Sequence, residues 1–419
     1  MRALAVVDGE HYAPVVRDAL DSLPYEFAAV WLAGGVEKLR GGDDYGVTVV
    51  AELEAAVAEH EPEVVVDLSD EPVLGPRERL RVASRVLALG LPYVGPDFRL
   101  DPPEFAPFPL PSLAVIGTGK RVGKTAVTGH LVRLLARDRE VVVVAMGRGG
   151  PPEPEVAEVR PTLDSLLALS RKGRHAASDY LETAALAGVV TIGCRRCGGG
   201  LAGTPGESNV LAGAALAAER EPDVVVFDGS GAAIPPVDVG ARVLVTSASQ
   251  PADVAAGYLN AYRILISDLV VATGGAGLGL ERAIAELKPG VQVIPAELLP
   301  RPVQSIAGRR LAFFSTAPAA AHGTLARHLQ EAHGAEVVQI SGNLARRAEL
   351  RTELEQTDAD VYLIEIKAAA IDVVAEAALE RGAEIVFADN ELVPAPGADL
   401  DAALLTLAER AAAKEPIAS

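Results

Sequence analysis

The chain has 419 residues, of which 49% are hydrophobic, and its formal net charge is −19 at pH 7 with a sequence pI near 4.9. This length predicts two or three domains, and the negative balance argues against nucleic acid or an anionic membrane as a partner. Two cysteines exclude a disulfide scaffold, and no apolar stretch reaches the roughly 18 residues of a membrane span, so we expect a soluble cytoplasmic protein.

Short apolar runs alternate with amphipathic stretches along the chain, a pattern typical of βαβ units and parallel sheets. In residues 1–100 this pattern predicts a Rossmann- or flavodoxin-like α/β domain that binds the substrate, with strands at 2–7, 27–32, 63–68 and 92–94. Ligands of open α/β sheets gather where the strands end. The loop after the first strand carries four polar side chains, which we take as substrate-binding candidates beside the alternative of an ordinary polar loop: Asp8, Glu10, His11 and Tyr12.

Five prolines lie between Asp101 and Pro111. A helix cannot continue through them, and the segment 101–111 is therefore predicted to be a stiff linker between domains.

Residues 112–128 read SLAVIGTGKRVGKTAVT, which predicts a buried strand, a glycine-bearing loop and the start of a helix. In such a phosphate-binding loop (P-loop) the backbone N–H groups turn onto phosphate oxygens, the lysine reaches the outer phosphates and the threonine hydroxyl ligates Mg²⁺. The strict pattern GxxxxGK[ST] has glycine where this chain has Thr118, a departure also found in the dethiobiotin synthetase family, which this loop resembles. A chance glycine-rich turn is the alternative. The residues assigned to ATP binding are Gly119, Lys120, Arg121, Val122, Gly123, Lys124, Thr125 and Ala126.

Positive charge gathers around this loop, because residues 114–148 hold seven Lys or Arg and two Asp or Glu in an otherwise acidic chain. Such an island concentrates small anions. Arg133, Arg137 and Arg139 fit a solvated helix face. Arg148, on a glycine-flanked turn after the next predicted strand, is assigned to catalysis and substrate binding.

Adjacent arginines, Arg195 and Arg196, end a predicted strand and precede three glycines. Guanidinium groups match phosphate oxygens bidentately, and the glycines let backbone N–H groups approach the same anion. We assign both arginines to catalysis and substrate binding, with Ser178 and Gly199 as further substrate contacts.

Three carboxylates are candidates for metal or acid–base chemistry. Asp179 and Glu182 stand three apart on a predicted helix, where they would share a metal ion or act as acid and base, and a solvated helix face is an equally good interpretation. The run DVVVFDG at 223–229 predicts a strand that ends in Asp228, as expected of a carboxylate that holds Mg²⁺ beside a P-loop. The predicted Mg²⁺ ligands are Thr125, Asp228 and Glu182.

Cys194 and Cys197 form a CxxC motif. A structural zinc site needs four ligands and the chain has no second CxxC, while thioredoxin-like chemistry lacks its fold context. We favour two partly buried thiols that shape the arginine turn, and a metal shared across a two-fold dimer is the alternative.

The remaining apolar runs complete two further regions. Strands at 141–146, 242–246, 268–272 and 291–294 belong to a P-loop ATP-binding catalytic domain at 112–302, and strands at 311–314, 336–340, 361–366 and 384–387 predict a C-terminal α/β domain at 303–419. The expected fold class is α/β and multi-domain, with parallel sheets and a central P-loop NTPase domain flanked by Rossmann-like regions.

Four segments together resemble the cyclic 2,3-diphosphoglycerate synthetase family: GTGKRVGKTA at 117–126, GRGGPPEPE at 147–155, HAASDYLE at 175–182 and TIGCRRCGGGLAG at 191–203. The likeness extends over nearly the whole chain, including VDGEHYAP at 7–14. The resemblance implies ATP-dependent closure of a phosphoanhydride between the two phosphates of 2,3-diphosphoglycerate, with release of ADP and phosphate. It implies ATP and Mg²⁺ as cofactors, with K⁺ as a further candidate, a small anionic phosphorylated substrate, and a homodimer.

The residues fit that reaction, because two anionic phosphates come together only where cations offset their repulsion. We assign γ-phosphoryl transfer to Lys124 and Lys120 with Mg²⁺, and the grip on the acceptor to Arg148, Arg195 and Arg196. Two other classes stay open: a P-loop carboxylate or amine ligase of the dethiobiotin synthetase type, and a nucleotide-switched MinD-like dimer. The latter usually carries a lysine where this chain has Gly119.

Overall fold

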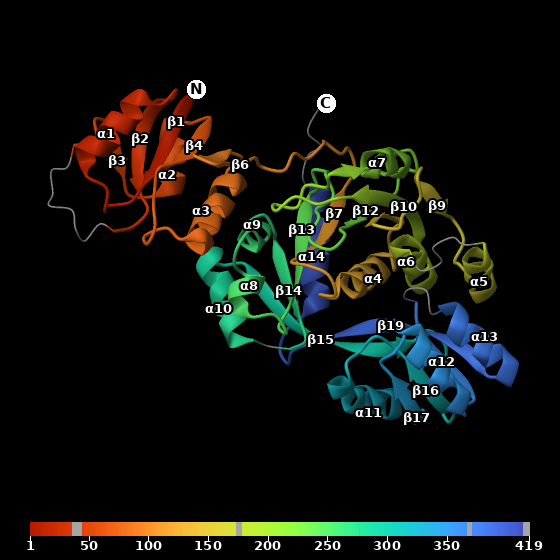
Figure 1. The fold of residues 1–419 in the computed structure, drawn as a ribbon. Helices are drawn as coiled ribbons and strands as arrows, with labels where there is room; N and C mark the ends of the chain where they lie inside the picture. Colours follow the sequence, from red (N-terminus) through yellow and green to blue (C-terminus); the bar gives the residue numbers. More distant parts are fainter. Residues whose placement is uncertain (36–43, 173–177, 276, 367–370, 414–419) are drawn as a thin grey trace. The chain divides into compact units, whose positions relative to one another are not determined.

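Two separate sheets form in the computed structural model, which describes residues 1–35, 44–172, 178–275, 277–366 and 371–413 (Figure 1). Each sheet belongs to its own compact unit. Unit 1 consists of Met1–Glu104, Gln250–Ser267 and Leu278–Val291, and unit 2 consists of Phe105–Ser249, Asp268–Gly277 and Gln292–Ser419. In the described part of the chain no helix combines the length and the apolar character needed to cross a membrane.

Unit 1 is built on a sheet in which the order of the described strands is β3-β2-β1-β4-β5-β6. Its strands are β1 (Arg2–Val7), β2 (Glu26–Leu32), β3 (Thr48–Val50), β4 (Val64–Asp67), β5 (Tyr93–Gly95) and β6 (Phe98–Leu100). All neighbours are parallel except β5 and β6. The four strands predicted here are confirmed, whereas β3 and β6, of three residues each, are too short for an apolar run to reveal.

Six helices belong to unit 1, counted over the described residues: α1 (Ala13–Ser22), α2 (Leu53–His60), α3 (Pro76–Ala88), α8 (Ala252–Ala255), α9 (Asn260–Leu265) and α10 (Leu278–Leu287). The last three come from the middle of the chain. The Ser84 hydroxyl of α3 donates to the Tyr258 carbonyl at 3.0 Å, and Arg77 pairs with Asp253 at 2.9 Å. These contacts place segments 170 or more residues apart in one unit.

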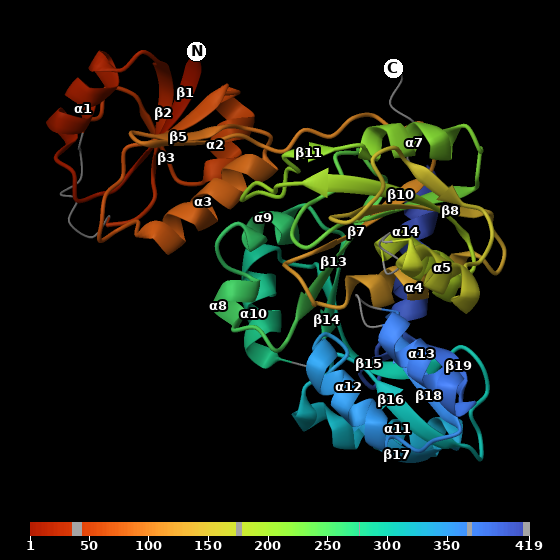
Figure 2. The same cartoon turned by 45° about the vertical axis from the view of Figure 1, so that its right-hand side comes forward.

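Unit 2 contains a long mixed sheet whose described strands follow the order β11-β10-β8-β12-β7-β13-β14-β15-β19-β18-β16-β17, with β9 paired to β10 (Figures 1 and 2). The P-loop half has β7 (Ser112–Gly117), β8 (Val141–Gly147), β9 (Glu155–Ala157), β10 (Val190–Cys197), β11 (Glu207–Ser208), β12 (Val224–Asp228), β13 (Ala241–Ser247), β14 (Leu269–Thr273) and β15 (Gln292–Pro302). The C-terminal half has β16 (Arg310–Phe314), β17 (Glu336–Ser341), β18 (Val361–Glu365) and β19 (Glu384–Pro394). The strands predicted for both regions are confirmed, and so is the α/β class.

The two halves meet at β15 and β19, which pair antiparallel from Ala296 with Pro394 to Pro302 with Ala388. β15 runs parallel to the P-loop strands through its first residues, and β19 runs parallel to β18 through its own first residues. Because only the later part of each strand enters the antiparallel pair, the halves are offset along the strands. The carboxyl ends of β16, β17 and β18 therefore face the carboxyl ends of the P-loop strands.

Helices cover both faces of this sheet: α4 (Lys124–Leu135), α5 (Leu163–Arg171), α6 (Asp179–Ala187), α7 (Val210–Ala218), α11 (His322–His333), α12 (Arg347–Gln356), α13 (Ile371–Arg381) and α14 (Leu400–Ala413), with a 3-10 turn η2 (Ala319–Ala321). One hydrophobic cluster joins Val127 of α4, Phe314 of the C-terminal half and Leu404 of α14. His130 of α4 also contacts Asp401 of α14 at 2.6 Å. The C-terminal helix thus returns to the P-loop sheet.

Arg133 corrects one sequence expectation. It was assigned to a solvated helix face, but it pairs with Asp389 of β19, a carboxylate that is 3% exposed and also pairs with Arg301 at 2.8 Å. Burial lowers the pKa of Arg133, while Asp389 raises it. The ion pair links the P-loop helix to the C-terminal half, a long-range contact that a sequence pattern does not contain.

Candidate functional site

The loop between β7 and α4 contains two residues in the left-handed region, one of which must be glycine. Arg121 and Gly123 have φ of 59° and 93°, and a Cβ on Gly123 would lie 2.9 Å from both Leu298 and Thr273 side-chain atoms. This left-handed geometry at Gly123 favours glycine. Thr118 stands where the strict pattern has glycine, and it anchors the loop to β13: its N–H donates to the Val245 carbonyl at 3.1 Å.

Lys124 is the first residue of α4 and is 9% exposed. Its Nζ donates to the Gly119 carbonyl at 3.0 Å, so the ammonium lies folded over the loop. Burial lowers the pKa of Lys124, while the carboxylates of Asp228 and Asp179 raise it. The ammonium is therefore held at the helix N-terminus with anionic groups around it, where a phosphate would meet both the charge and the helix dipole.

Asp228 ends β12, which lies between β7 and β8 as expected of the acidic strand beside a P-loop. Its carboxylate is 3% exposed and accepts a hydrogen bond from the Thr128 hydroxyl at 3.0 Å. Burial raises the pKa of Asp228 to about 7, with a further contribution from Asp179, and Lys124 opposes the rise. A buried oxygen ligand of this kind suits a hard cation.

Asp179 completes the anionic side of the site from the first turn of α6. Its Oδ2 lies 3.3 Å from the position that a Cβ on Gly147 would occupy, next to the end of β8. Asp179 acts on the pKa of Lys124, Asp228 and Arg196. The sequence named Asp179 and Glu182 together as a candidate pair, but it placed only Glu182 among the predicted Mg²⁺ ligands. The spacing of the two acids was the available signal. Glu182 is buried and lines the adjoining cavity.

Three of the predicted cationic residues gather near these carboxylates. Arg196 donates to the carbonyls of Gly198 at 2.6 Å and Ser230 at 2.8 Å, which fixes its guanidinium. A Cβ on Gly231 would lie 3.3 Å from Arg196 Nη2 and 3.8 Å from Lys120 Cγ. Burial lowers the pKa of Arg196, the charge of Arg148 lowers it further, and Asp179 raises it. Lys120, Arg148 and Arg196 thus form one basic cluster.

Arg195 differs from its neighbour, because it is exposed and its backbone N–H makes the anchoring contact. That N–H donates to Asn209 Oδ1 at 2.7 Å, and Asn209 Nδ2 donates to the carbonyls of Pro151 and Pro152. Asn209 therefore ties the end of β10 to the loop that carries Arg148. Its position gave no sequence signal, since a single asparagine after a short strand has no distinctive spacing.

The two cysteines have different surroundings. Cys194 is buried against Gly213 of α7, and burial raises the pKa of its thiol to about 12, whereas Cys197 is exposed. Cys194 thus acts as a packing group behind the arginine turn.

Ser178 is the N-cap residue of α6 and is 5% exposed, and within the described residues its hydroxyl has no hydrogen-bond partner. Gly199 follows β10, near Arg196 Nη1. The preceding part of the motif at 175–182, residues 175–177, lies outside the described residues. Substrate contact by Ser178 and Gly199 stays a prediction.

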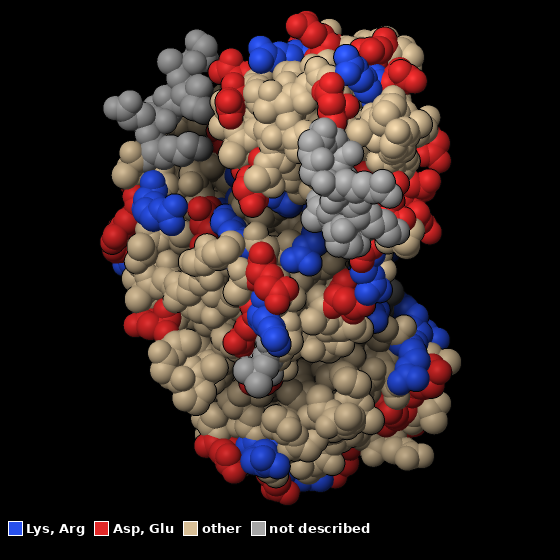
Figure 3. Space-filling model, turned by 90° about the vertical axis from the view of Figure 1, so that its left-hand side faces the viewer, with Lys and Arg blue, Asp and Glu red and all other residues tan. Residues whose placement is uncertain are grey.

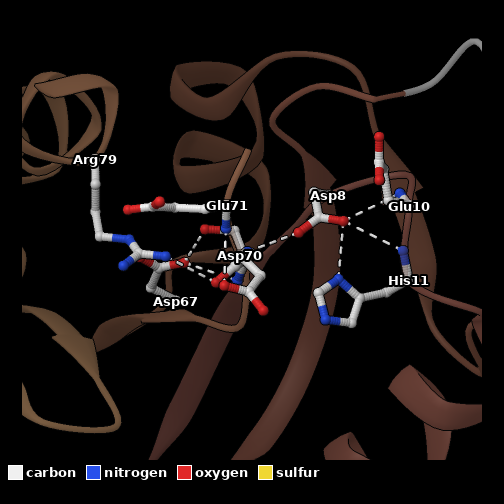
Figure 4. Close-up of polar contacts among 8 residues, drawn as sticks. Asp8, Glu10, His11, Asp67, Asp70, Glu71 and Arg79 are labelled. Carbon is white, nitrogen blue, oxygen red and sulfur yellow. Dashed lines mark hydrogen bonds and ion pairs between the residues drawn. The ribbon is translucent and has the colours of Figure 1, made fainter. Parts of the chain in front are cut away.

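The acidic strand ends of unit 1 form a separate hydrogen-bonded cluster (Figure 4). Asp8 is 1% exposed and accepts hydrogen bonds from the N–H groups of Glu10, His11 and Asp70 and from the His11 ring at 2.8 Å. Burial raises the pKa of Asp8, but the bonds from His11 and Asp70 outweigh it and the net pKa is lowered. Asp8 thus organises the loop.

The other candidates of this loop are more accessible than Asp8: Glu10 and Tyr12 are exposed and His11 is half-buried. Asp67, at the end of β4, is held by Tyr93, Ser69 and Arg79. Binding of the substrate by Asp8, Glu10, His11 and Tyr12 stays a prediction.

A cavity of about 1070 Å³ adjoins the P-loop within unit 2, lined by Lys124, Thr125 and Ala126 on one side and by residues of the C-terminal half on the other. On the face of the molecule shown in Figure 3, acidic and basic side chains are interspersed.

A parallel sheet with a P-loop, a buried acidic strand end beside it and a cluster of cations defines an enzyme of the P-loop nucleotide-binding class. Family models match residues 2–101, 112–298 and 302–391 as the N-terminal, P-loop and C-terminal domains of cyclic 2,3-diphosphoglycerate synthetase. The chain belongs to the cyclic 2,3-diphosphoglycerate synthetase family.

Relatives of that name cover almost the whole chain. The chain is 53% identical to the cyclic 2,3-diphosphoglycerate synthetase of Rubrobacter xylanophilus over 98% of each protein. It is 40% identical to that of Thermococcus kodakarensis over 97% of this chain and 98% of the relative, and 38% identical to that of Methanothermus fervidus over 93% and 92%.

Proposed function

We propose that the chain catalyses ATP-dependent closure of 2,3-diphosphoglycerate to its cyclic phosphoanhydride, with release of ADP and inorganic phosphate. The observation that carries the proposal is the cluster of Lys120, Arg148 and Arg196 beside Lys124 and Asp228, in a chain that belongs to the synthetase family. Positive charge fixed before the reaction offsets the repulsion between substrate phosphates.

The reaction balances in two transfers. The γ-phosphoryl group of ATP passes to an oxygen of one substrate phosphate, which breaks the bond to ADP. The second substrate phosphate then attacks the substrate phosphorus of that new anhydride, closes the ring and displaces inorganic phosphate. A phosphate dianion is already a nucleophile, so no side chain has to remove a proton.

The chain's residues divide this work. Lys124 holds the outer phosphates of ATP at the helix N-terminus, and Lys120 neutralises charge on the group in transfer. Arg196 keeps its guanidinium fixed by two carbonyl contacts and, with Arg148, holds the acceptor. Arg195 lies one residue away on the exposed strand end and binds the outer side of the acceptor.

The residues present also fit Mg²⁺. The buried carboxylate of Asp228 and the hydroxyl of Thr125 on the first turn of α4 are hard oxygen donors, and Glu182 is the third ligand candidate from the sequence. When bound, Mg²⁺ supplies positive charge between the nucleotide phosphates. K⁺ as a further cofactor, the homodimer and the cytoplasmic location stay predictions.

Phosphate release from ATP tests the proposal. We expect strong stimulation by 2,3-diphosphoglycerate and none by a panel of amino acids, diamines and carboxylic acids, with the cyclic product identified by ³¹P NMR. Strong stimulation by an amino acid or diamine, with none by 2,3-diphosphoglycerate, would reject the cyclisation in favour of a ligase.

The double change of Arg195 and Arg196 to Ala separates acceptor binding from nucleotide binding. The KM for 2,3-diphosphoglycerate should rise by about 100-fold or more, while the affinity for ATP stays within about twofold. Lys124→Ala should instead weaken ATP binding. An equal loss of ATP affinity in both variants would contradict this division.

A further inference from the structure

The cavity beside the P-loop has a second wall that the proposed chemistry leaves without a role. This wall belongs to the C-terminal half, where Thr316 and Asn343 follow β16 and β17, and Glu365 is the last residue of β18. β16 lies between β17 and β18. The chain therefore passes from β16 to β17 on one side of β16, and then to β18 on its other side. A crevice at the carboxyl ends of strands where the order reverses is the usual ligand position of an open α/β sheet.

The wall offers an apolar surface. Phe313, Leu325 and Ile340 of the C-terminal half line the cavity, together with Leu298 and Pro300 of β15. The P-loop side contributes the first turn of α4 through Thr125 and Ala126. A cavity of about 1070 Å³ with such a lining has room for a flat apolar ring system, and Lys124, which holds the phosphates in the proposed function, lines the same cavity.

Asn343 supplies a directed acceptor in the wall. Its Nδ2 lies 2.5 Å from Glu353 Oε1, and Glu353 also accepts from the Ser341 hydroxyl. Because a carboxylate only accepts, the amide must present its NH₂ to Glu353. This leaves the Asn343 Oδ1 as an acceptor, and among the described residues this buried atom has no hydrogen-bond partner.

The charged side chains of the C-terminal wall indicate which part of the reactants binds in this cavity. Glu353 and Glu365 line the C-terminal wall together with one cation, Arg346. Glu365 accepts from the N–H of Thr316 at 3.2 Å. The basic cluster of Lys120, Arg148 and Arg196 is not part of the cavity lining. With two carboxylates against one guanidinium, the wall suits a doubly phosphorylated acid less well than a neutral group with apolar faces and N–H or O–H donors.

We propose that the C-terminal half binds the nucleoside of the nucleotide whose phosphates the P-loop holds. The base packs against Phe313, Leu298 and Pro300, and Asn343 Oδ1 accepts a hydrogen bond from the base or the ribose. This inference rests on the proposed use of ATP and gives the C-terminal half a function in the same site. The P-loop and the basic cluster bind phosphates, and this wall binds the nucleoside.

Two substitutions test the wall. Asn343→Ala removes the acceptor, and Ala345→Trp fills the cavity from an exposed lining position, where the larger side chain does not disturb the core. Binding is measured by titration calorimetry with Mg²⁺ and two probes, ATP and inorganic tripolyphosphate, which has the phosphates without the nucleoside. Asn260→Ala in unit 1 is the matched control.

We expect both wall variants to weaken ATP binding by about tenfold or more and to bind tripolyphosphate within about twofold of the parent, which also shows that they are folded. Asn260→Ala should change neither, and Lys124→Ala should weaken both. Unchanged ATP binding in the wall variants, or an equal loss for both probes, would overturn the proposal. A raised KM for 2,3-diphosphoglycerate with unchanged ATP affinity would assign the cavity to the acceptor instead.

The two proposals fail differently. If 2,3-diphosphoglycerate does not stimulate phosphate release while ATP binding still depends on Asn343, the proposed reaction is wrong and the nucleoside site stands. If stimulation occurs but Asn343 and Ala345 do not affect ATP, the reaction stands and the assignment of the wall is wrong.

Discussion

The buried carboxyl group of Asp228 makes the stability of the protein and the charge of the site depend on pH. Its pKa is raised to about 7 in the folded protein by burial and by Asp179, against an ordinary value of 3.8. Between these two values the folded chain keeps a proton that the unfolded chain has released. Stability therefore falls as pH rises through this window. The same deprotonation prepares Asp228 for a cation.

We predict that Asp228→Asn removes this contribution. From pH 5 to pH 8 in the absence of Mg²⁺, the unfolding free energy of the parent should fall by about 1–3 kcal/mol relative to that of the variant. Urea unfolding at the two pH values measures it. A difference that is constant with pH would show that Asp228 is already ionised at pH 5.

Arg196 tests geometry separately from charge. Arg196→Lys keeps the charge but loses the planar fork whose two Nη atoms donate to the carbonyls of Gly198 and Ser230. We predict a rise of about tenfold in the KM for 2,3-diphosphoglycerate, with ATP affinity unchanged. Steady-state kinetics measure it, and Arg195→Lys on the exposed neighbouring position is the matched control with a smaller effect. Equal effects would mean that charge alone matters at this turn.

At the scale of elements, Asp389 joins the P-loop helix to the C-terminal half. Its carboxylate is nearly fully buried and pairs with Arg133 of α4 and Arg301 of β15. Removing the anion leaves two cations facing each other, whereas removing Arg133 leaves Asp389 paired with Arg301. Loss of the common partner is the more costly change.

We predict that Asp389→Ala lowers the unfolding free energy by about 3–5 kcal/mol and Arg133→Ala by less. Urea unfolding of both variants and of the double variant measures the coupling. Arg351→Ala, on an exposed position of α12, is the control. An Arg133→Ala variant less stable than Asp389→Ala would contradict the central role of the carboxylate.

At the scale of the whole chain, the P-loop half and the C-terminal half of unit 2 share one hydrophobic cluster that includes α14. Leu404 of α14 is fully buried, and Gly240 lies so close to Ala411 that a Cβ there would be 2.6 Å from the Ala411 Cα. The last helix is therefore a structural part of the P-loop half, although it follows the C-terminal strands in the chain.

We predict that Leu404→Ala costs about 2–4 kcal/mol and lowers the midpoint at which ATP-dependent phosphate release is lost on heating. Leu379→Ala, at an exposed position of α13, should change stability by no more than about 0.5 kcal/mol. Calorimetry and thermal inactivation measure both. Equal stability of the two variants would mean that α14 is not part of the core.

Local patterns predicted much of this protein. The P-loop, the strand ending in Asp228 and the α/β alternation are visible in the sequence because short spacings encode them: small loop residues that expose N–H groups, and apolar runs of strand length. The synthetase family was also recognisable from contiguous motifs. Very short strands such as β3 and β11 were not visible, since two or three residues set no periodicity.

Only the tertiary structure decided which charged side chains share the site and what faces the P-loop. Adjacent arginines on one strand have different exposures because successive strand residues point to opposite faces. Asp179 reaches Lys124 because α6 packs on α4, and the C-terminal wall reaches the P-loop because β15 and β19 pair antiparallel with an offset. These contacts join residues far apart in the chain, and their energies depend on burial and distance, which no local pattern contains.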